Sequence, residues 1–468
     1  MKTAVICSRE DFFYDIHSLV KSFYPDDDVT IFASGDDEKS HMAYDRVIEV
    51  TVPDYTDRPA AKSELKRQLY KRLEKETGQS LPWGTLSGIR PTKIPMKGLC
   101  DGLSDEEICR HMAETYLTSD KRIRLALEIA KREKALTDPL KPGWDLYAGI
   151  PFCPTICSYC TFSSSPIGKW ADTVDAYLDA LIAEMTASAA FFRGSPNTIY
   201  IGGGTPTSLE PAQLERLLSA VDSLFPTDRV KEYTVEVGRP DTVTPEKLKV
   251  LKSHPVTRIS VNPQTMNDRT LELIGRRHTA ADTVRAFEMA REAGFDNINM
   301  DLIMGLPDED LPEVTATLEA IRRLGPDSLT IHSLAMKRAS HLTIERDLYR
   351  TRLFRNSEAI MDEAARTAEE LGLKPYYLYR QKNMKGNLEN VGYASEGKEC
   401  LYNILIMEEI DSIVACGAGA STKAVLPGGR IERIVNPKDI RTYLAKLDDL
   451  IAKKTDEAFW SSDIIKKE

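Results

Sequence analysis

The sequence lacks any apolar run long enough to cross a membrane. Its amino terminus, MKTAVICSRED, holds a short apolar stretch with charged residues directly after it, which is unlike a signal peptide. Basic residues are also in deficit, because 62 Lys and Arg stand against 72 Asp and Glu and give a formal net charge of −10. These absences argue against a membrane protein, a secreted protein and a non-specific binder of nucleic acid. We therefore expect a protein of the reduced cytoplasm.

Cysteine is scarce, and most of it is scattered. The spacing C-x-x-x-C-x-x-C brings three cysteines, Cys153, Cys157 and Cys160, into one short loop. The apolar stretch Leu146–Ile150, which Pro151 ends, predicts a buried strand that runs into this loop. The other five stand in apolar or helical contexts and are expected as free thiols: Cys7, Cys100, Cys109, Cys400 and Cys416.

Three thiolates in one loop fit some metal sites better than others. They leave a four-coordinate structural zinc one ligand short, unless a fourth ligand comes from elsewhere in the chain. They can hold three corners of a cubane iron–sulfur cluster and leave the fourth iron open to an outside ligand. A disulfide is disfavoured, because three is an odd number and the chain indicates a reducing compartment. From the spacing alone, the open cluster, the zinc knuckle and chance clustering are all retained.

The length of 468 residues allows two or three domains. Residues 1–138 predict a small α/β module with a helix at Asp11–Phe23 and three strands, at Thr3–Cys7, Val29–Ala33 and Arg46–Val52. Prolines at 139 and 142 mark a linker. We expect the main domain over residues 144–340, and an α-rich extension over residues 341–468 that begins with a long helix.

The main domain alternates strand-like and helix-like segments. Amphipathic helical patterns, such as Val174–Ala190 and Pro211–Leu224, separate the apolar strand candidates. Six β-then-α units predict a parallel sheet in an open, partial (β/α)6 barrel, with chemistry at the carboxyl ends of the strands. The cysteine loop follows the first strand and lies on that side. The strand candidates are Leu146–Ile150, Thr198–Ile201, Tyr233–Val237, Arg258–Val261, Ile298–Ile303 and Ser328–Ile331.

Polar or glycine residues follow several of these strands. Gly202–Gly204 after the second strand would let a ligand approach the backbone closely, although a plain tight turn is the alternative. Glu236 in the third strand needs a partner if it is buried, either a bound ammonium group or a barrel arginine. Each polar residue alone could be structural, but together they predict a ligand site at the barrel mouth. The others are Gln264, Arg276 and Asp301.

These residues, in this order, resemble the radical S-adenosylmethionine superfamily, and within it the branch of the oxygen-independent coproporphyrinogen III oxidases. The resemblance covers roughly residues 145–340. The stretches LPWGTLSGIRPTK and YYLYRQKNMKGNLENVGYASEGKECLYN are similar to the HemZ-type coproporphyrinogen dehydrogenases. The motifs that carry the resemblance are Y-x-G-I-P-F-C-x-x-x-C-x-Y-C at Tyr147–Cys160, GGGTPT at Gly202–Thr207, Glu236, Gln264, Arg276 and DLIMGLP at Asp301–Pro307.

The resemblance implies a ligand set. Cys153, Cys157 and Cys160 would hold a 4Fe–4S cluster, whose open iron is chelated by the amino and carboxyl groups of S-adenosylmethionine. Further residues would contact that molecule: Tyr147, the backbone of Tyr159, Gly203 and Glu236. A second S-adenosylmethionine would match Gly204, Thr205, Gln264, Arg276, Asp301 and Ala335.

The resemblance also implies an activity. An electron from a reductant such as flavodoxin or ferredoxin cleaves S-adenosylmethionine to a 5′-deoxyadenosyl radical, which takes a hydrogen from the β-carbon of a propionate. Loss of carbon dioxide and one electron leaves a vinyl group, and two rounds convert coproporphyrinogen III to protoporphyrinogen IX in heme biosynthesis. The protein positions the reactants and excludes water, while the cofactor performs the difficult step.

Two departures from the oxidase pattern leave alternatives open. Phe162 stands where the oxidase has a fourth cysteine, and Gly149 stands where it has a histidine. Phe162 resembles the heme chaperones of the HemW type, although their His-Asn…Tyr-Trp motif is not found here. A heme chaperone is one alternative. A radical tetrapyrrole methyltransferase or heme-opening enzyme is the other.

An anionic tetrapyrrole with four propionates would need cationic partners. Solvated surface charge is the alternative role for each of the four candidates, which are Arg90, Arg338, Arg380 and Lys382.

Overall fold

The computed structural model describes residues 1–35, 44–52, 55–88, 90–140, 143–335, 340–344, 349, 351–381, 388–460 and 465. Their contacts divide the chain into two compact units. The first comprises Met1–Lys134 together with Leu378–Asn390, and the second comprises Ala135–Tyr377 together with Val391–Glu468. The stretch from 378 to 390, which we expected to belong to the carboxyl-terminal extension, therefore packs with the amino-terminal residues.

The first unit contains a three-stranded parallel sheet in the order β2-β1-β3. Apolar side chains of α1 and α3 form its core with the strands, which confirms the α/β pattern predicted for this region. Ser104 and Glu107 form a reciprocal capping box at the start of α5. The elements are β1 (Lys2–Cys7), α1 (Phe13–Phe23), β2 (Asp28–Ala33), β3 (Arg46–Val50), α3 (Arg58–Thr77), α4 (Lys93–Cys100), α5 (Asp105–Tyr116) and α6 (Asp120–Thr137).

The second unit is built on six parallel strands, which confirms the six strand candidates. Neighbours along the chain are neighbours in the sheet, in the order β4-β7-β8-β9-β10-β11. Their side chains are almost all buried, as expected for parallel strands covered by helices. The strands are β4 (Trp144–Ile150), β7 (Thr198–Gly203), β8 (Glu232–Gly238), β9 (Arg258–Val261), β10 (Ile298–Met304) and β11 (Ser328–Ser333).

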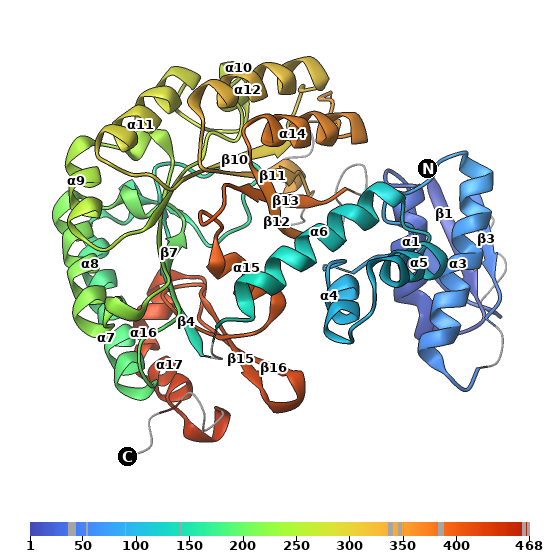
Figure 1. Cartoon of the computed structure of the whole chain (residues 1–468), viewed down its shortest axis with the longest axis horizontal. Coiled ribbons are helices and arrows are strands. Elements are labelled where there is room, and N and C mark those ends of the chain that lie inside the picture. The colour runs from blue at the N-terminus through green and yellow to red at the C-terminus, as the bar shows by residue number, and fades with distance from the viewer. Residues whose placement is uncertain are drawn as a thin grey trace. The chain divides into compact units, whose positions relative to one another are not determined.

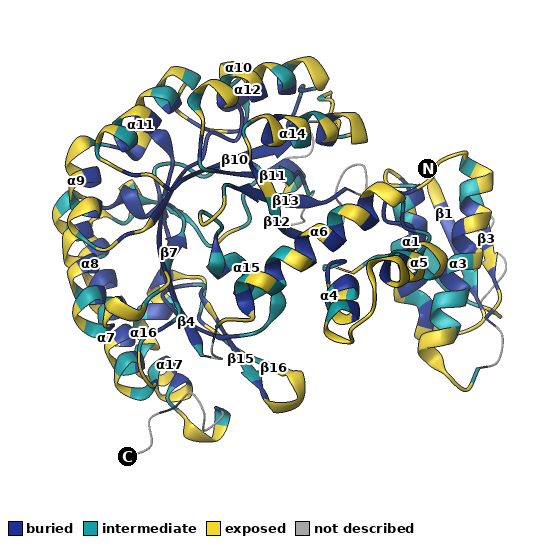
Figure 2. Cartoon of the chain, viewed as in Figure 1, coloured by how far each residue is buried: buried dark blue, intermediate teal, exposed yellow. Residues whose placement is uncertain are grey.

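Helices form an arc outside this curved sheet (Figure 1). Their buried faces meet the strands and their outer faces are exposed (Figure 2), which is the physical reason for their amphipathic sequences. Capping boxes fix the starts of α11 at Thr279 and of α12 at Asp310. The helices are α7 (Val174–Phe191), α8 (Pro211–Leu224), α9 (Pro245–Ser253), α10 (Asp268–Leu273), α11 (Ala280–Glu292) and α12 (Leu311–Leu324).

The carboxyl-terminal residues add strands to both edges of the sheet. β13 pairs antiparallel with β11, while β14 pairs parallel with β4, so β4 and β11 are not neighbours and the barrel stays open. Besides the helices expected here, the extension thus contributes β12 (Lys374–Tyr379), β13 (Asn390–Ala394), β14 (Ser412–Cys416), β15 (Ser421–Leu426) and β16 (Arg430–Val435).

The expectation of one long helix from about residue 340 was wrong. The described helices there are the short α13 (His341–Ile344) and α14 (Glu358–Glu370), whose start is capped by Ser357. Further on come α15 (Leu401–Glu408), α16 (Ile440–Ala445) and α17 (Leu447–Lys454). Among the residues that the structure describes, none of the helices combines the length and apolar composition that crossing a bilayer requires.

Candidate functional site

The cysteine loop leaves β4 at the carboxyl end of the sheet and is closed at its base. Phe152–Cys153 pairs with Ser165–Pro166 in a two-stranded bridge, and the Ser165 amide donates to the Pro151 carbonyl at 2.7 Å. The tip is tethered to the turn after α10, because the Ser158 amide donates to the Ile274 carbonyl at 3.0 Å. Backbone contacts thus hold both the base and the tip of the loop.

The three cysteines are free thiols in this loop. Cys153 and Cys157 are buried and Cys160 is half-buried. Burial raises the pKa of the Cys153 thiol to about 11 and also raises the pKa of Cys160. The thiols of Cys153 and Cys160 would therefore ionise at neutral pH only when a metal takes the place of the proton.

The cysteines do not converge on a single point. Within the described ranges, no three His, Cys, Asp or Glu side chains lie close enough together to hold one metal ion. A cubane does not require such convergence, because each of its thiolates binds a different iron. The donor set, three soft thiolates from one loop, fits three corners of such a cluster.

The glycine turn after β7 lies against the cysteine loop. The Gly204 amide donates to the Ile150 carbonyl and the Thr205 amide to the Phe152 carbonyl, each at 2.7 Å. A Cβ atom on Gly204 would come within 2.6 Å of the Phe152 carbonyl oxygen and 3.0 Å of the Cys153 sulfur. Gly203 has a φ of 110°, which side chains rarely adopt. These glycines are thus required by the close approach of the two loops.

Tyr147 and Glu236 project from neighbouring parts of the same sheet. The Tyr200 hydroxyl donates to the Glu236 carboxylate, and the rings of Tyr147, Tyr200 and Tyr402 stack, with Tyr200 and Tyr402 4.5 Å apart. Burial raises the pKa of Glu236 to about 7, while the Tyr200 hydrogen bond opposes the rise. Among the described residues no ion pair joins Glu236 to an arginine, although the charge of Arg258 in β9 lowers the pKa of Glu236, and a ligand ammonium group would lower it further.

Gln264 and Arg276 form a second polar group at the mouth. Gln264 has a φ of 70°, its amide donates to the Asp301 carbonyl at 2.9 Å, and its buried side-chain oxygen has no protein partner. Arg276 donates to the Asn262 carbonyl at 2.5 Å and to the Tyr159 hydroxyl at 3.1 Å, but its buried Nε has no protein partner. Buried polar atoms without partners are costly, so this group fits a polar ligand.

Asp301 lies in β10 beside two partners. The Asn299 amide donates to it at 2.7 Å, and His332 Nε2 is 3.8 Å from its carboxylate. Burial opposes ionisation, but the bonds from His332 and Asn299 outweigh it and lower the pKa of Asp301. Asp301 is therefore a carboxylate at neutral pH, and Ala335 follows just beyond the end of β11.

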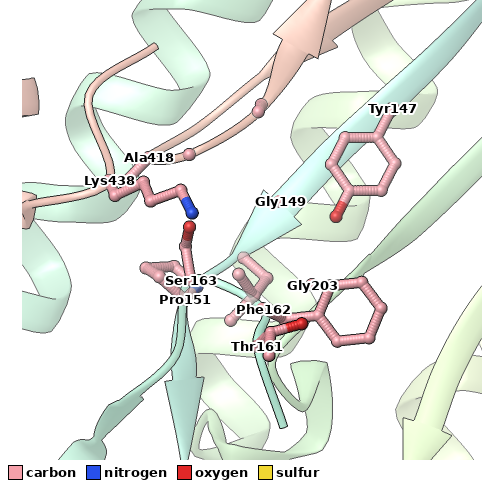
Figure 3. A pocket seen from close by; sticks show the side chains of 12 residues that line it. Tyr147, Gly149, Pro151, Thr161, Phe162, Ser163, Gly203, Ala418 and Lys438 are labelled. Carbon is pink, nitrogen blue, oxygen red and sulfur yellow. The ribbon is translucent and has the colours of Figure 1, made fainter. Parts of the chain in front are cut away.

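A cavity of about 170 Å³ lies between the end of β4, the cysteine loop and the glycine turn after β14. Figure 3 shows Lys438 reaching into it from the carboxyl-terminal segment and Tyr147 from β4. Phe162, the residue in place of the oxidase cysteine, borders the cavity and is 75% exposed. The complete lining is Tyr147, Gly149, Ile150, Pro151, Thr161, Phe162, Ser163, Gly203, Ala418, Gly419, Ala420 and Lys438.

A buried ion pair supports the glycine turn on the carboxyl-terminal side of this cavity. Glu184 of α7 is 0% exposed and pairs with Lys454 of α17, which is 1% exposed, at 2.5 Å. The same carboxylate accepts from the Gly417 amide at 2.7 Å, and Lys454 donates to the Ala415 carbonyl at 2.6 Å. The last helix is thereby connected to the cavity wall.

Of the four candidate propionate partners, the structure describes two, and both belong to the first unit. Arg338 and Lys382 lie outside the described residues. Arg380 is buried in the first unit, where it donates to the Leu86 carbonyl at 2.6 Å, and Arg90 belongs to the same unit. We therefore do not retain Arg380 as a substrate ligand.

Several residues at the site were not predicted from the sequence. Tyr200, His332 and Lys438 contact or line the predicted group, and Arg239 donates to the Cys157 sulfur at 3.8 Å. Tyr200 could have been found from its position two residues before the glycine turn, on the same strand. The other three have no local pattern that distinguishes them from surface or core residues.

Comparisons with known proteins agree on the family. Residues 147–321 match the family model of the radical SAM superfamily. The oxygen-independent coproporphyrinogen-III oxidase-like protein HemZ of Bacillus subtilis (strain 168) is 40% identical over 413 residues, which cover 86% of this chain and 82% of that protein. The heme chaperone HemW of the same strain is 41% identical over 194 residues, 41% of this chain and 50% of that protein.

A solved structure shares the fold. Coproporphyrinogen III oxidase (HemN) from Escherichia coli matches with a TM-score of 0.52 and 22% identity, over 68% of this chain and 72% of that chain. Radical SAM proteins bind a 4Fe–4S cluster and S-adenosylmethionine (SAM). The chain belongs to the radical SAM superfamily, in the family of the HemZ protein.

Proposed function

We propose that this protein is a radical SAM enzyme that oxidatively decarboxylates the propionate side chains of a coproporphyrinogen. The observation that carries this proposal is the likeness to HemZ, which extends over 86% of the chain and thus far beyond the superfamily motif. HemZ itself is named as an oxygen-independent coproporphyrinogen-III oxidase-like protein.

The chain's own residues bind and orient the reactants. Cys153, Cys157 and Cys160 would hold the cluster, which with bound SAM and an electron from a flavodoxin- or ferredoxin-type donor would supply a 5′-deoxyadenosyl radical. Tyr147 and Glu236 would hold the intact SAM before its cleavage: the carboxyl of Glu236, with its pKa near 7, would gain a cation to pair with when the SAM ammonium group binds.

A second SAM is part of the proposal. The partnerless oxygen of Gln264 and the partnerless Nε of Arg276 offer one acceptor and one donor at the mouth. We expect equilibrium dialysis to give two SAM per cluster, and Gln264→Ala to reduce the count to one while the cluster is kept. A count of one SAM per cluster in the wild-type protein would restrict the site to one SAM, and a count of two in Gln264→Ala would exclude Gln264 as a ligand of the second molecule. The residues assigned to the second molecule are Gly204, Thr205, Gln264, Arg276, Asp301 and Ala335.

The electrons of the reaction balance if the substrate passes one electron to an external acceptor. The radical takes a hydrogen atom from the propionate β-carbon and becomes 5′-deoxyadenosine. The bond to the carboxylate carbon then breaks, carbon dioxide leaves, and one electron passes to a one-electron acceptor, which leaves the vinyl group.

The test is an anaerobic assay of the reconstituted protein with coproporphyrinogen III, SAM and a reductant. We expect products in which one and then two propionates have become vinyl groups, with 5′-deoxyadenosine formed alongside them. A cluster-loaded protein that forms 5′-deoxyadenosine but no vinyl product would overturn the assignment. Methylated or linear tetrapyrroles in the same mass spectra would assign it to a methyltransferase or a heme-opening enzyme.

A heme chaperone is the second candidate. Two observations favour it: the 41% identity to HemW and the exposed Phe162 in place of the oxidase cysteine. A chaperone would bind one heme tightly and turn over little SAM. Heme titration monitored by absorbance, run beside the SAM cleavage assay on the same preparation, separates the two functions.

A further inference from the structure

Arg239 directly follows β8, at the start of the turn Pro240–Thr242, and does not line the cavity described above. Its side chain is only 3% exposed. The pairing of β8 with β9 shifts register between Glu236 and Gly238, and Gly238, the residue before Arg239, pairs with Val261. We propose that Arg239 is a positioning residue that raises the reduction potential of the iron–sulfur cluster through Cys157.

The guanidinium group is fixed on two sides. Its Nη1 donates to the Cys157 sulfur at 3.8 Å and to the Thr155 hydroxyl at 2.7 Å. Its Nε and Nη2 donate to the two carboxylate oxygens of Asp241, at 2.9 and 2.7 Å. A bidentate carboxylate of this kind leaves Arg239 a single orientation, with Nη1 directed at the sulfur.

The charges around Cys157 leave a positive surplus. Asp241 cancels the charge of Arg239, but a second buried arginine, Arg276, interacts electrostatically with Cys157. On the other side of Asp241 lies His278, whose Nδ1 is 3.8 Å from the carboxylate. Burial lowers the pKa of His278, so this ring is neutral at pH 7 and adds no charge.

A positive charge and an N–H donor at a cluster sulfur stabilise the more negative, reduced state. Reduction adds one electron to the cluster and breaks no bond, so the potential responds directly to nearby charge. Hydrogen bonds to ligand sulfurs, net charge and burial are the protein's means of setting cluster potentials. In this buried setting the interaction is weakly screened. The effect concerns the cluster alone and does not depend on which tetrapyrrole the protein binds.

A purely structural role is the alternative, because Arg239 also holds Thr155. Two variants that change the local charge in opposite directions distinguish the electrostatic role from the structural one. Arg239→Met removes a positive charge and is expected to shift the midpoint potential of the cluster in the negative direction. Asp241→Asn removes the compensating negative charge and is expected to shift it in the positive direction. Arg239→Lys, which keeps the charge, is expected to recover part of the shift.

The control is Thr155→Val, which removes the hydroxyl contact and leaves both charges in place. The measurement is an anaerobic redox titration of the cluster-loaded full-length protein without substrate, followed by electron paramagnetic resonance and normalised to iron and sulfide content. We expect Thr155→Val to keep the wild-type potential. Shifts of Arg239→Met and Asp241→Asn in the same direction, or no shift in either at full cluster content, would overturn the proposal. If Arg239→Met does not retain a cluster, Asp241→Asn and Arg239→Lys decide the question between them.

Discussion

At the scale of single residues, the candidate site depends on thiols and a carboxyl group whose pKa values are raised by burial. The sequence allowed the cysteines, Gly203 and Glu236 to be selected, because each stands at the end of an apolar strand. It did not allow Tyr200 or Arg239 to be selected. Their roles come from contacts between segments about 36 and 82 residues apart, Tyr200 with Glu236 and Arg239 with Cys157.

The first prediction concerns the cluster ligands. Replacing Cys160 by alanine should remove one iron ligand and reduce iron and sulfide content after reconstitution to near zero. Cys100→Ala is the matched control, because Cys100 is an exposed free thiol in the first unit. Iron analysis and the visible absorbance of both variants check this. Full cluster content in Cys160→Ala would contradict the ligand assignment.

The second prediction concerns Glu236. Its folded pKa of about 7 lies above the usual glutamate pKa of 4.5, so stability is lost as pH rises through that range. Glu236→Gln removes this loss and should stabilise the SAM-free protein at pH 8 by about 1–3 kcal/mol, with little effect at pH 5.

The same substitution should weaken SAM binding, because an amide cannot pair with an ammonium group as a carboxylate does. Wild-type affinity for SAM should also fall as pH drops below about 7, whereas the affinity of Glu236→Gln should not change over that range. Thermal melting and calorimetric titration at pH 6 and pH 8 measure both effects. Equal SAM affinity of the two proteins at pH 8 would exclude this contact.

At the scale of elements, the six βα units could be predicted because each buried parallel strand is a continuous apolar run between amphipathic helices. The hairpin of β15 and β16 was missed. Its two sequences, STKAVL and RIERIV, contain charged residues, as edge strands often do. The same charges would suit an exposed helix, so the sequence does not distinguish the two structures. The prediction of one long helix was wrong for a related reason: the helical periodicity before α14 does not reveal where the helix is interrupted.

The third prediction concerns the contact between two of these elements, the glycine turn and the cysteine loop. In Gly204→Ala the new methyl group would meet the Phe152 carbonyl at 2.6 Å. Such overpacking costs about 1–3 kcal/mol and should displace Cys153, which lowers cluster content and SAM affinity together. Gly168→Ala is the control, because no atom lies within 4 Å of its added carbon. Wild-type behaviour of Gly204→Ala would show that the loops can separate.

At the scale of the whole molecule, the last helix of the chain takes part in the site through Glu184 and Lys454. Nothing in the charged tail sequence distinguishes Lys454 from its neighbours, so this connection could not be predicted. A site built from residues far apart in sequence needs such links, because the glycine turn itself has few side chains to hold it.

The fourth prediction follows from that pair. Lys454→Met leaves a buried carboxylate without its cation and should destabilise the protein by about 3–5 kcal/mol. It should also weaken SAM binding, because Glu184 supports the turn that lines the cavity. Adding Glu184→Gln should restore part of the stability, since neither charge is then buried. Melting temperatures of the single and double variants test this. No recovery in the double variant would contradict the pairing.

The first unit is discontinuous along the chain. The Trp83 indole donates to Glu389 at 2.7 Å, and Arg122 pairs with the same carboxylate at 3.1 Å, both fully inside that unit. During translation, the residues up to 134 emerge long before residue 378. At roughly 5–20 residues per second, the nascent amino-terminal segment waits about 10–50 s for Glu389 to leave the ribosome. The contacts of Trp83 and Arg122 with Glu389 can therefore form only after most of the second unit has been made.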